Sequence, residues 1–377
     1  MHHGRDHDID ALLASRGVSR RDFLAWCGSV AVLLGAGETF APQVAAAVSA
    51  GATRKPVVWL SQGLCTGCTE SMAQIAFPDV PSLVLDVLSI DYWETVMAGA
   101  GQAAEKAKTD AIDSGGYLLV VEGALMRGFG GNACRIAGKT GLEHLREAAA
   151  GADAIIAVGS CAVDGGWVRA VPRSAKTDGV GLKDVRELLG GKPVVNLPGC
   201  PVNPEWVVAV AIDHLLLGKL PALDAQGRPK LIYGATIHDN CPRRGHFENG
   251  EFVEAFGTPA EAAGWCLYKM GCKGPQTATN CPLVRWNRKA SWCVESGSPC
   301  IGCGNLDWVS KDAPFLARMP DVMGVRPETV GAVAGTAVVA GLAVHGVAQA
   351  MTGRMGGGGP EEGAGPQAPT GADGGDE

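Results

Sequence analysis

Short apolar runs alternate with helix-like stretches over residues 51–217, and this alternation is the clearest pattern in the chain. Pro56–Leu60 reads as a strand, and a helix is expected to begin near Thr69, after a Gly- and Cys-containing loop. Further runs predict strands at Leu83–Leu88, Tyr117–Glu122, Ala154–Gly159 and Val194–Leu197, with helices at Thr140–Ala150 and Lys183–Leu189. Strands that alternate with helices predict an α/β fold built on a doubly wound parallel sheet.

Cysteines follow three of these predicted strands. Cys65 and Cys68 come after the first strand, and Cys161 and Cys200 come after the last two. Because ligands gather at the carboxyl ends of the strands in an open parallel sheet, these cysteines are expected to meet. Four thiolates can hold zinc or an iron–sulfur cluster. Their spread over separate Gly-rich loops favours the bulkier cluster.

The pattern changes after residue 217. From 218 to about 326 the chain is rich in Cys, Pro and Gly and shows little periodicity, which is typical of chain wrapped around inorganic clusters. Two further sets of candidate ligands lie there: His238, Cys241, Cys266 and Cys272, and then Cys281, Cys293, Cys300 and Cys303. Neither set is decisive on its own, since a CxxC pair is common.

Composition narrows the function classes. The odd count of 13 cysteines in 377 residues argues against a simple disulfide framework, which a chain of this length does not need. The net charge of −7 argues against nucleic-acid binding, which requires a basic face. With 46% hydrophobic residues the chain can bury a substantial core.

Both ends carry targeting patterns. Ser19-Arg20-Arg21-Asp22-Phe23-Leu24 precedes an apolar stretch and predicts a twin-arginine export leader at 1–50, cleaved after Ala47 or Ala50. Residues Thr329 to Thr352 contain no Asp, Glu, Lys or Arg, which predicts a membrane anchor helix at 327–353 and a disordered tail at 354–377. A buried helix is the alternative for the anchor. His345 within it is expected either to bind haem or a partner helix, or to lie near the lipid interface.

Seven segments, in order over about residues 57–310, give the chain a specific resemblance: TGCTES, VGSCAVDGG, NLPGCPVNPEW, IHDNCPRRGHFENGEF, GWCLYKMGCKGPQT, NCPLVRWN and SPCIGC. Together they resemble the small subunits of nickel–iron hydrogenases. The leader and the anchor resemble those of the exported, membrane-bound members of that family. The resemblance implies a flavodoxin-like domain at 51–217 and a two-cluster iron–sulfur domain at 218–326. It implies an electron-transfer subunit of an enzyme whose catalytic residues lie in a separate large subunit.

The resemblance also implies three clusters. A proximal [4Fe–4S] cluster would be held by Cys65, Cys68, Cys161 and Cys200. A distal [4Fe–4S] cluster would be held by His238, Cys241, Cys266 and Cys272. The medial cluster would be held by Cys281, Cys300 and Cys303, and it is [3Fe–4S] in many relatives, which have a proline where this chain has Cys293. Our hypothesis is that Cys293 supplies a fourth ligand and makes this cluster [4Fe–4S]; the alternative is a spectator thiol beside [3Fe–4S].

A second departure concerns oxygen. Oxygen-tolerant relatives carry two extra cysteines near the proximal cluster, where the motifs place Gly67 and Gly166 in this chain. The resemblance therefore implies an ordinary proximal cluster and an oxygen-sensitive enzyme.

The expected partners are a [NiFe] large subunit and an integral-membrane subunit, quinone-reducing or of the cytochrome b type, in a dimer of heterodimers. The expected location is the periplasmic side of the cytoplasmic membrane, where hydrogen oxidation would feed quinone. Three alternatives remain open at this point: the cluster-bearing subunit of a respiratory quinone reductase, a zinc-stabilised exported binding protein, and a free-standing electron carrier. The first would explain the first four cysteines but not the eight later ligands.

Overall fold

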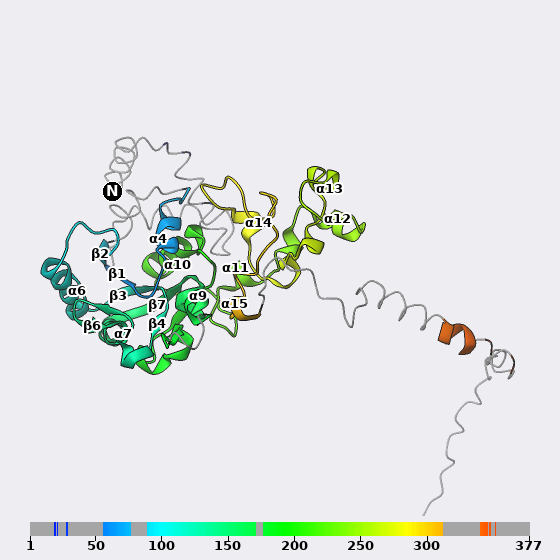
Figure 1. Ribbon diagram of the computed structural model, residues 1–377. Coiled ribbons are helices and arrows are strands. Elements are labelled where there is room, and N and C mark those ends of the chain that lie inside the picture. Colours follow the sequence, from blue (N-terminus) through cyan, green and yellow to red (C-terminus); the bar gives the residue numbers. More distant parts are fainter. Residues whose placement is uncertain are drawn as a thin grey trace, which may run out of the picture. The chain divides into compact units, whose positions relative to one another are not determined.

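The computed structural model describes residues 56–76, 89–170 and 176–311, together with Ser19, Arg21, Gly28, 340–345, Val347 and Met351. The chain divides into two units, Met1–Arg318 and Met319–Glu377, and the first of them holds the central sheet and the helices around it (Figure 1). Almost all of the predicted leader, most of the predicted anchor and the predicted strand at Leu83–Leu88 lie outside the described residues. No helix in the described part of the chain is long and apolar enough to cross a membrane.

A sheet of five parallel strands forms the centre of the fold. The strands are β1 (Pro56–Ser61), β2 (Ser89–Trp93), β3 (Tyr117–Glu122), β7 (Ala152–Val158) and β9 (Val194–Leu197). They lie in the order β2-β1-β3-β7-β9, and each neighbouring pair is parallel. Counted along the chain this is the order 2-1-3-4-5, which characterises flavodoxin-like doubly wound sheets. The predicted α/β fold with a parallel sheet is confirmed.

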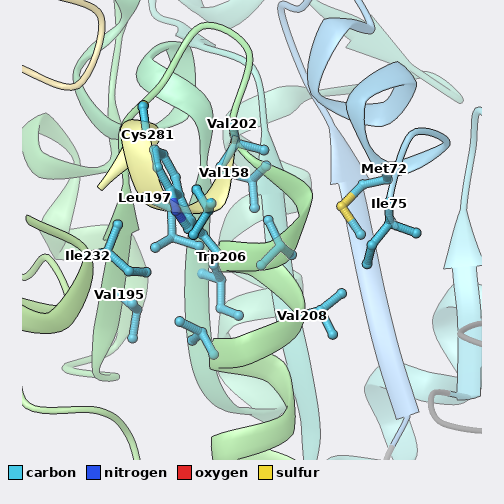
Figure 2. Packing of buried hydrophobic residues seen from close by; sticks show 14 of the residues in the cluster. Met72, Ile75, Val158, Val195, Leu197, Val202, Trp206, Val208, Ile232 and Cys281 are labelled. Carbon is cyan, nitrogen blue, oxygen red and sulfur yellow. The ribbon is translucent and has the colours of Figure 1, made fainter. Parts of the chain in front are cut away.

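Helices cover both faces of the sheet because successive strand residues point to opposite sides. Val57 and Trp59 of β1 belong to a buried cluster with α4 (Gly67–Met72) and α10 (Pro204–Leu217). Val58 and Leu60 belong to a second cluster with α6 (Gln102–Ser114) and α7 (Gly141–Gly151). Figure 2 shows the first cluster, in which Trp206 of α10 packs near Leu197 and Val158 of the sheet.

Local sequence signals set the starts of two long buried helices. Thr140 and Glu143 form a capping box at the start of α7. The Asn203 side chain caps α10 by accepting from the Glu205 N–H, and Pro204 occupies the first helical position.

Short elements connect the sheet and line its edge. These are β4 (Leu125–Met126) paired with β8 (Gly179–Val180), β5 (Arg135–Ile136) paired with β6 (Lys139–Thr140), α8 (Gly159–Asp164), α9 (Gly166–Arg169), and the 3-10 turns η3 (Gly128–Gly131), η5 (Leu182–Asp184) and η6 (Arg186–Leu189).

Residues 218–311 contain only short elements and pack against the first face of the sheet. The helices are α11 (Lys230–Tyr233), α12 (Arg244–Glu248), α13 (Pro259–Ala262), α14 (Cys281–Val284) and α15 (Trp308–Lys311), with 3-10 turns η7 (His238–Asn240), η8 (Tyr268–Met270) and η9 (Gly274–Gln276). Cys281 and Cys300 are buried in the same cluster as Trp206. The Trp206 indole N–H donates to Asn280 Oδ1 at 2.8 Å. This region therefore shares its apolar core with the sheet.

Candidate metal centres

The first four predicted ligands meet at the carboxyl end of the sheet. Cys65 and Cys68 follow β1, Cys161 lies in α8 directly after β7, and Cys200 follows β9. Burial first, and then negative charge that includes the Cys161 and Cys200 thiols, raises the pKa of Cys68 well above its ordinary value. Burial raises the pKa of Cys161 to about 11, with smaller contributions from Cys200 and Cys65. The four thiols therefore lie within electrostatic reach of one another at this edge of the sheet.

Glycines leave room beside these sulfurs. A Cβ atom on Gly159, which has φ +81°, would lie 2.5 Å from the Cys68 Sγ. A Cβ on Gly166 would lie 2.9 Å from the Cys161 Sγ, and one on Gly67 would lie 3.2 Å from the Cys65 Sγ. Gly67 and Gly166 thus border sulfurs of this first group. Only glycine lets the backbone pass this close to the thiols.

The predicted medial ligands form a second group, more deeply buried than the first. Cys281 and Cys300 are 7% and 5% exposed. Burial raises the pKa of Cys281 to about 11, and the nearby Cys293 adds to this shift. Burial also raises the pKa of Cys303, with contributions from Cys281 and Cys293. Cys293 is exposed as a residue, yet burial of its thiol raises its pKa. Cys293 thus lies within electrostatic reach of Cys281 and Cys303, and also of Cys272.

The predicted distal ligands line a hollow in the irregular region. His238, Cys241, Cys266 and Cys272 border about 350 Å³ of space not filled by protein atoms, part of it open to solvent. The His238 ring contacts Phe247 edge to face, with 4.6 Å between ring centroids. Burial, and then the charge of Cys272, raises the pKa of Cys266.

Several sulfurs accept hydrogen bonds, which favour the thiolate form that ligates metal. The Val202 N–H donates to Cys68 Sγ at 3.4 Å, and the Thr279 hydroxyl donates to Cys281 Sγ at 3.1 Å. The Cys300 N–H donates to Cys272 Sγ at 3.3 Å. Since Cys300 belongs to the medial group and Cys272 to the distal group, this last bond joins two predicted sites.

The bonding state of the thiols agrees with a role as ligands. All twelve described cysteines are free thiols. Cys134 lies apart from the three groups, with its Sγ 4.0 Å from Gln62 Oε1. Among the described residues, no three His, Cys, Asp or Glu side chains are close enough to hold a single metal ion. Free thiols in three groups have the donor chemistry that iron–sulfur clusters require.

Glu122 is a residue that the sequence did not single out. It ends β3 and is 2% exposed, and its carboxylate accepts from the Trp59 indole N–H at 3.0 Å. It also accepts from the Thr69 hydroxyl at 2.6 Å and from the Thr69 N–H at 3.1 Å, so it holds the start of α4 beside Cys68. The only available signal was an acidic residue at the end of an apolar run, which is equally typical of a strand that reaches solvent.

Comparison with known proteins identifies similar sequences. The family profile for the C-terminal part of the NiFe/NiFeSe hydrogenase small subunit matches residues 233–316, and one described as "NADH ubiquinone oxidoreductase, 20 Kd subunit" matches residues 65–214. The periplasmic [NiFe] hydrogenase small subunit of Solidesulfovibrio fructosivorans is 45% identical over 316 residues, which cover 84% of this chain and 98% of that protein. The quinone-reactive Ni/Fe-hydrogenase small chain of Wolinella succinogenes is 40% identical over 354 residues, which cover 90% of this chain and 98% of that protein.

A solved structure has the same fold. The reduced, active Ni-Fe-Se hydrogenase from Desulfomicrobium baculatum matches with a TM-score of 0.65 and 34% identity. The match covers 71% of this chain and all of that one (100%).

Proposed function

Since this chain belongs to the small-subunit family of nickel–iron hydrogenases, we propose that it relays electrons through three iron–sulfur clusters, from a [NiFe] large subunit to a quinone-reducing membrane partner. As the iron–sulfur subunit of a heteromeric hydrogenase, it contributes electron transfer and not the hydrogen-splitting site. Each cluster, when bound, supplies a site that gains and loses one electron at a time.

The ligands that we propose follow the three groups of side chains. Cys65, Cys68, Cys161 and Cys200 would hold the proximal [4Fe–4S] cluster. Cys281, Cys293, Cys300 and Cys303 would hold the medial cluster as [4Fe–4S], or as [3Fe–4S] without Cys293. His238, Cys241, Cys266 and Cys272 would hold the distal [4Fe–4S] cluster.

The observation that carries the proposal is the continuity of the three groups. The Cys303 thiol of the medial group, whose pKa is raised mainly by burial and by Cys281, is also in reach of Cys200 of the proximal group: a backbone hydrogen bond from Cys200 lowers this pKa, and the charge of the Cys200 thiol raises it by less. The Cys300 N–H of the medial group bonds to the Cys272 sulfur of the distal group. Neighbouring groups are thus in direct contact or in electrostatic reach, which is the arrangement that stepwise electron transfer needs.

The alternatives are less well supported. A respiratory quinone-reductase subunit accounts for the profile match at 65–214, which contains the first four ligands. It does not account for the eight ligands between His238 and Cys303, which lie within the hydrogenase profile at 233–316. A zinc-stabilised binding protein would not need three groups in sequence across two regions of the chain.

We also propose the membrane arrangement. The twin-arginine leader at 1–50 would export the folded chain, and the helix at 327–353 would anchor it on the periplasmic side, followed by a tail at 354–377. The quinone-reactive relative from Wolinella succinogenes supports a quinone-reducing partner. Of the anchor, residues 340–345 are described as helical and exposed, and His345, the candidate haem ligand, is among them. Assembly as a dimer of heterodimers belongs to the same proposal.

The test is electron paramagnetic resonance of the purified complex, as isolated and after reduction under hydrogen, combined with an iron count. We expect three four-iron clusters in this subunit besides the active-site iron, and loss of the reduced signals when hydrogen is replaced by an oxidant. A colourless complex without iron, or one with zinc in its place, would refute the proposal.

A further inference from the structure

One fully buried carboxylate joins two of the proposed sites. Asp164 ends α8, three residues after Cys161, and is 0% exposed. Its Oδ1 accepts from the Gly166 N–H at 3.0 Å, and its Oδ2 accepts from the Asp307 N–H at 2.5 Å. Gly166 borders the Cys161 sulfur, whereas Asp307 lies four residues after Cys303. The two oxygens therefore bind backbone of the proximal and the medial regions.

The bonding pattern matches an ionised carboxylate. Both oxygens accept hydrogen bonds from amides, so neither is placed to donate a proton to them. Burial of a charge is costly unless it is compensated. Burial raises the pKa of Asp164, and this rise is opposed by the two amides and then by Lys183, which binds Asp307 Oδ1 at 2.7 Å; these three groups favour the ionised form. Arg169 donates to the Asp164 carbonyl at 3.1 Å.

The charge of Asp164 reaches a proximal ligand. After burial and the neighbouring thiols, Asp164 contributes to the raised pKa of Cys161. A group that disfavours negative charge on this sulfur also disfavours the addition of an electron to a cluster bound there.

Building on the proposed function, we infer that Asp164 is a positioning residue that ties the proximal ligand loop to the medial segment and whose negative charge lowers the reduction potential of the proximal cluster. An uncharged side chain could still tie the two segments together, but it would not lower the reduction potential of the proximal cluster. A proximal cluster of lower potential would pass its electron onward more readily.

Ser160 forms a second tie between the same regions. Its hydroxyl donates to the Cys303 carbonyl at 2.9 Å and accepts from the Gly199 N–H at 3.1 Å. Because this tie does not depend on Asp164, we expect the two sites to keep their spacing when only the charge of Asp164 is removed.

The experiment is a redox titration of the complete complex, monitored by electron paramagnetic resonance, for wild type, Asp164→Asn, Asp164→Ser and Asp113→Asn. Asp113 is exposed on α6, so its variant makes the same charge change away from the site. We expect the proximal potential to rise in Asp164→Asn and in Asp164→Ser, and to stay unchanged in Asp113→Asn. Magnetic coupling between the reduced proximal and medial clusters reports their spacing and should persist.

An unchanged or lowered proximal potential in Asp164→Asn would overturn the inference. If that variant does not assemble, Asp164→Ser decides, because it also removes the charge while its hydroxyl can still accept the Gly166 N–H. An unchanged or lowered potential in Asp164→Ser would also overturn the inference. If the inference is overturned in one of these ways while the wild-type complex contains the expected iron, the proposed function still stands. Wild-type complex without iron would instead refute the proposed function itself.

Discussion

Cys293 decides the nature of the proposed medial site. Its charge acts on both Cys281 and Cys303, so the thiol lies close enough to join their group. We expect Cys293→Ala to remove one iron per complex and to produce a [3Fe–4S] signal in the oxidised state that wild type lacks, because one iron loses its thiolate. Cys134→Ala is the matched control, since Cys134 lies outside all three groups, and its iron count should equal that of wild type. A [3Fe–4S] signal already present in wild type would mean that Cys293 is a spectator.

Asp213 on α10 gives the fold a pH dependence. It is 2% exposed, and its Oδ1 has no hydrogen-bond partner among the residues that the structure describes. Burial, opposed in part by Lys219, raises its pKa from 3.8 to about 6. The charged form of Asp213 is therefore disfavoured in the folded state. Its free-energy cost to folding is absent below the pKa that Asp213 has in the unfolded chain and grows between that pKa and the folded-state pKa. Above the folded-state pKa the cost is complete.

Asp213→Asn should consequently raise the free energy of unfolding by roughly 1–3 kcal/mol above pH 7, where wild type bears the whole cost. The advantage should shrink as the pH falls from 6 towards 4. Thermal unfolding of the complex at pH 5 and pH 7.5 would measure the difference. An equal gain at both pH values would show that the carboxyl group does not titrate as described.

Single residues mark the limit of what the sequence could predict. The proximal cysteines were predictable as a group because each follows a strand, and strand ends meet at one edge of a parallel sheet. Asp164 was not predictable, because its role depends on Asp307, 143 residues further along the chain. Its neighbourhood in the sequence resembles an ordinary Asp-Gly turn.

At the level of elements, strands were predicted better than helices. The predicted strands at Tyr117–Glu122 and Val194–Leu197 have the observed bounds, and β7 begins two residues earlier than predicted. The predicted helix at Lys183–Leu189 is wrong: two 3-10 turns replace it, because Val185 adopts φ −133° and interrupts the helix. The helix α10 is apolar on nearly all sides, so its sequence shows no amphipathic period by which it could be recognised.

The turn between β7 and α8 should tolerate no side chain at Gly159. Alanine there would bring Cβ to 2.5 Å from the Cys68 sulfur, in addition to the strain of φ +81°. We expect Gly159→Ala to lose the proximal cluster, seen as a lower iron count and loss of its reduced signal. Gly138→Ala separates the two causes, because Gly138 has φ +85° and a Cβ added there would meet no atom within 4 Å. That variant should lose only about 1–2 kcal/mol of stability and keep all its iron. Equal iron loss in both variants would implicate backbone strain in place of the contact with sulfur.

At the scale of the whole molecule, the sheet and residues 218–311 share one apolar core. This shared core explains how irregular chain could hold the proposed clusters at fixed positions. Residues 218–311 contain no described helix longer than the five residues of α12, so regular secondary structure does not fix their shape. Instead Cys281 packs with Trp206 and Leu197 (Figure 2), and Cys300 belongs to the same buried cluster. The sequence predicted that this region lacks a core of its own, but it could not indicate that the core of the sheet would extend into it.

The anchor can be tested separately from the electron-transfer unit. A chain that ends after Arg326 keeps every proposed ligand and lacks the apolar run at 327–353. We expect its complex to appear in the soluble fraction and to reduce a soluble dye with hydrogen at the wild-type rate, while hydrogen-dependent quinone reduction is lost, because contact with the membrane partner requires the helix. A chain that ends after Gly353 is the control, and it should remain in the membrane fraction with quinone reduction intact. If the shorter chain also stayed in the membrane after a carbonate wash, another subunit would hold the complex there, and the apolar run would have to be assigned to contacts within the protein.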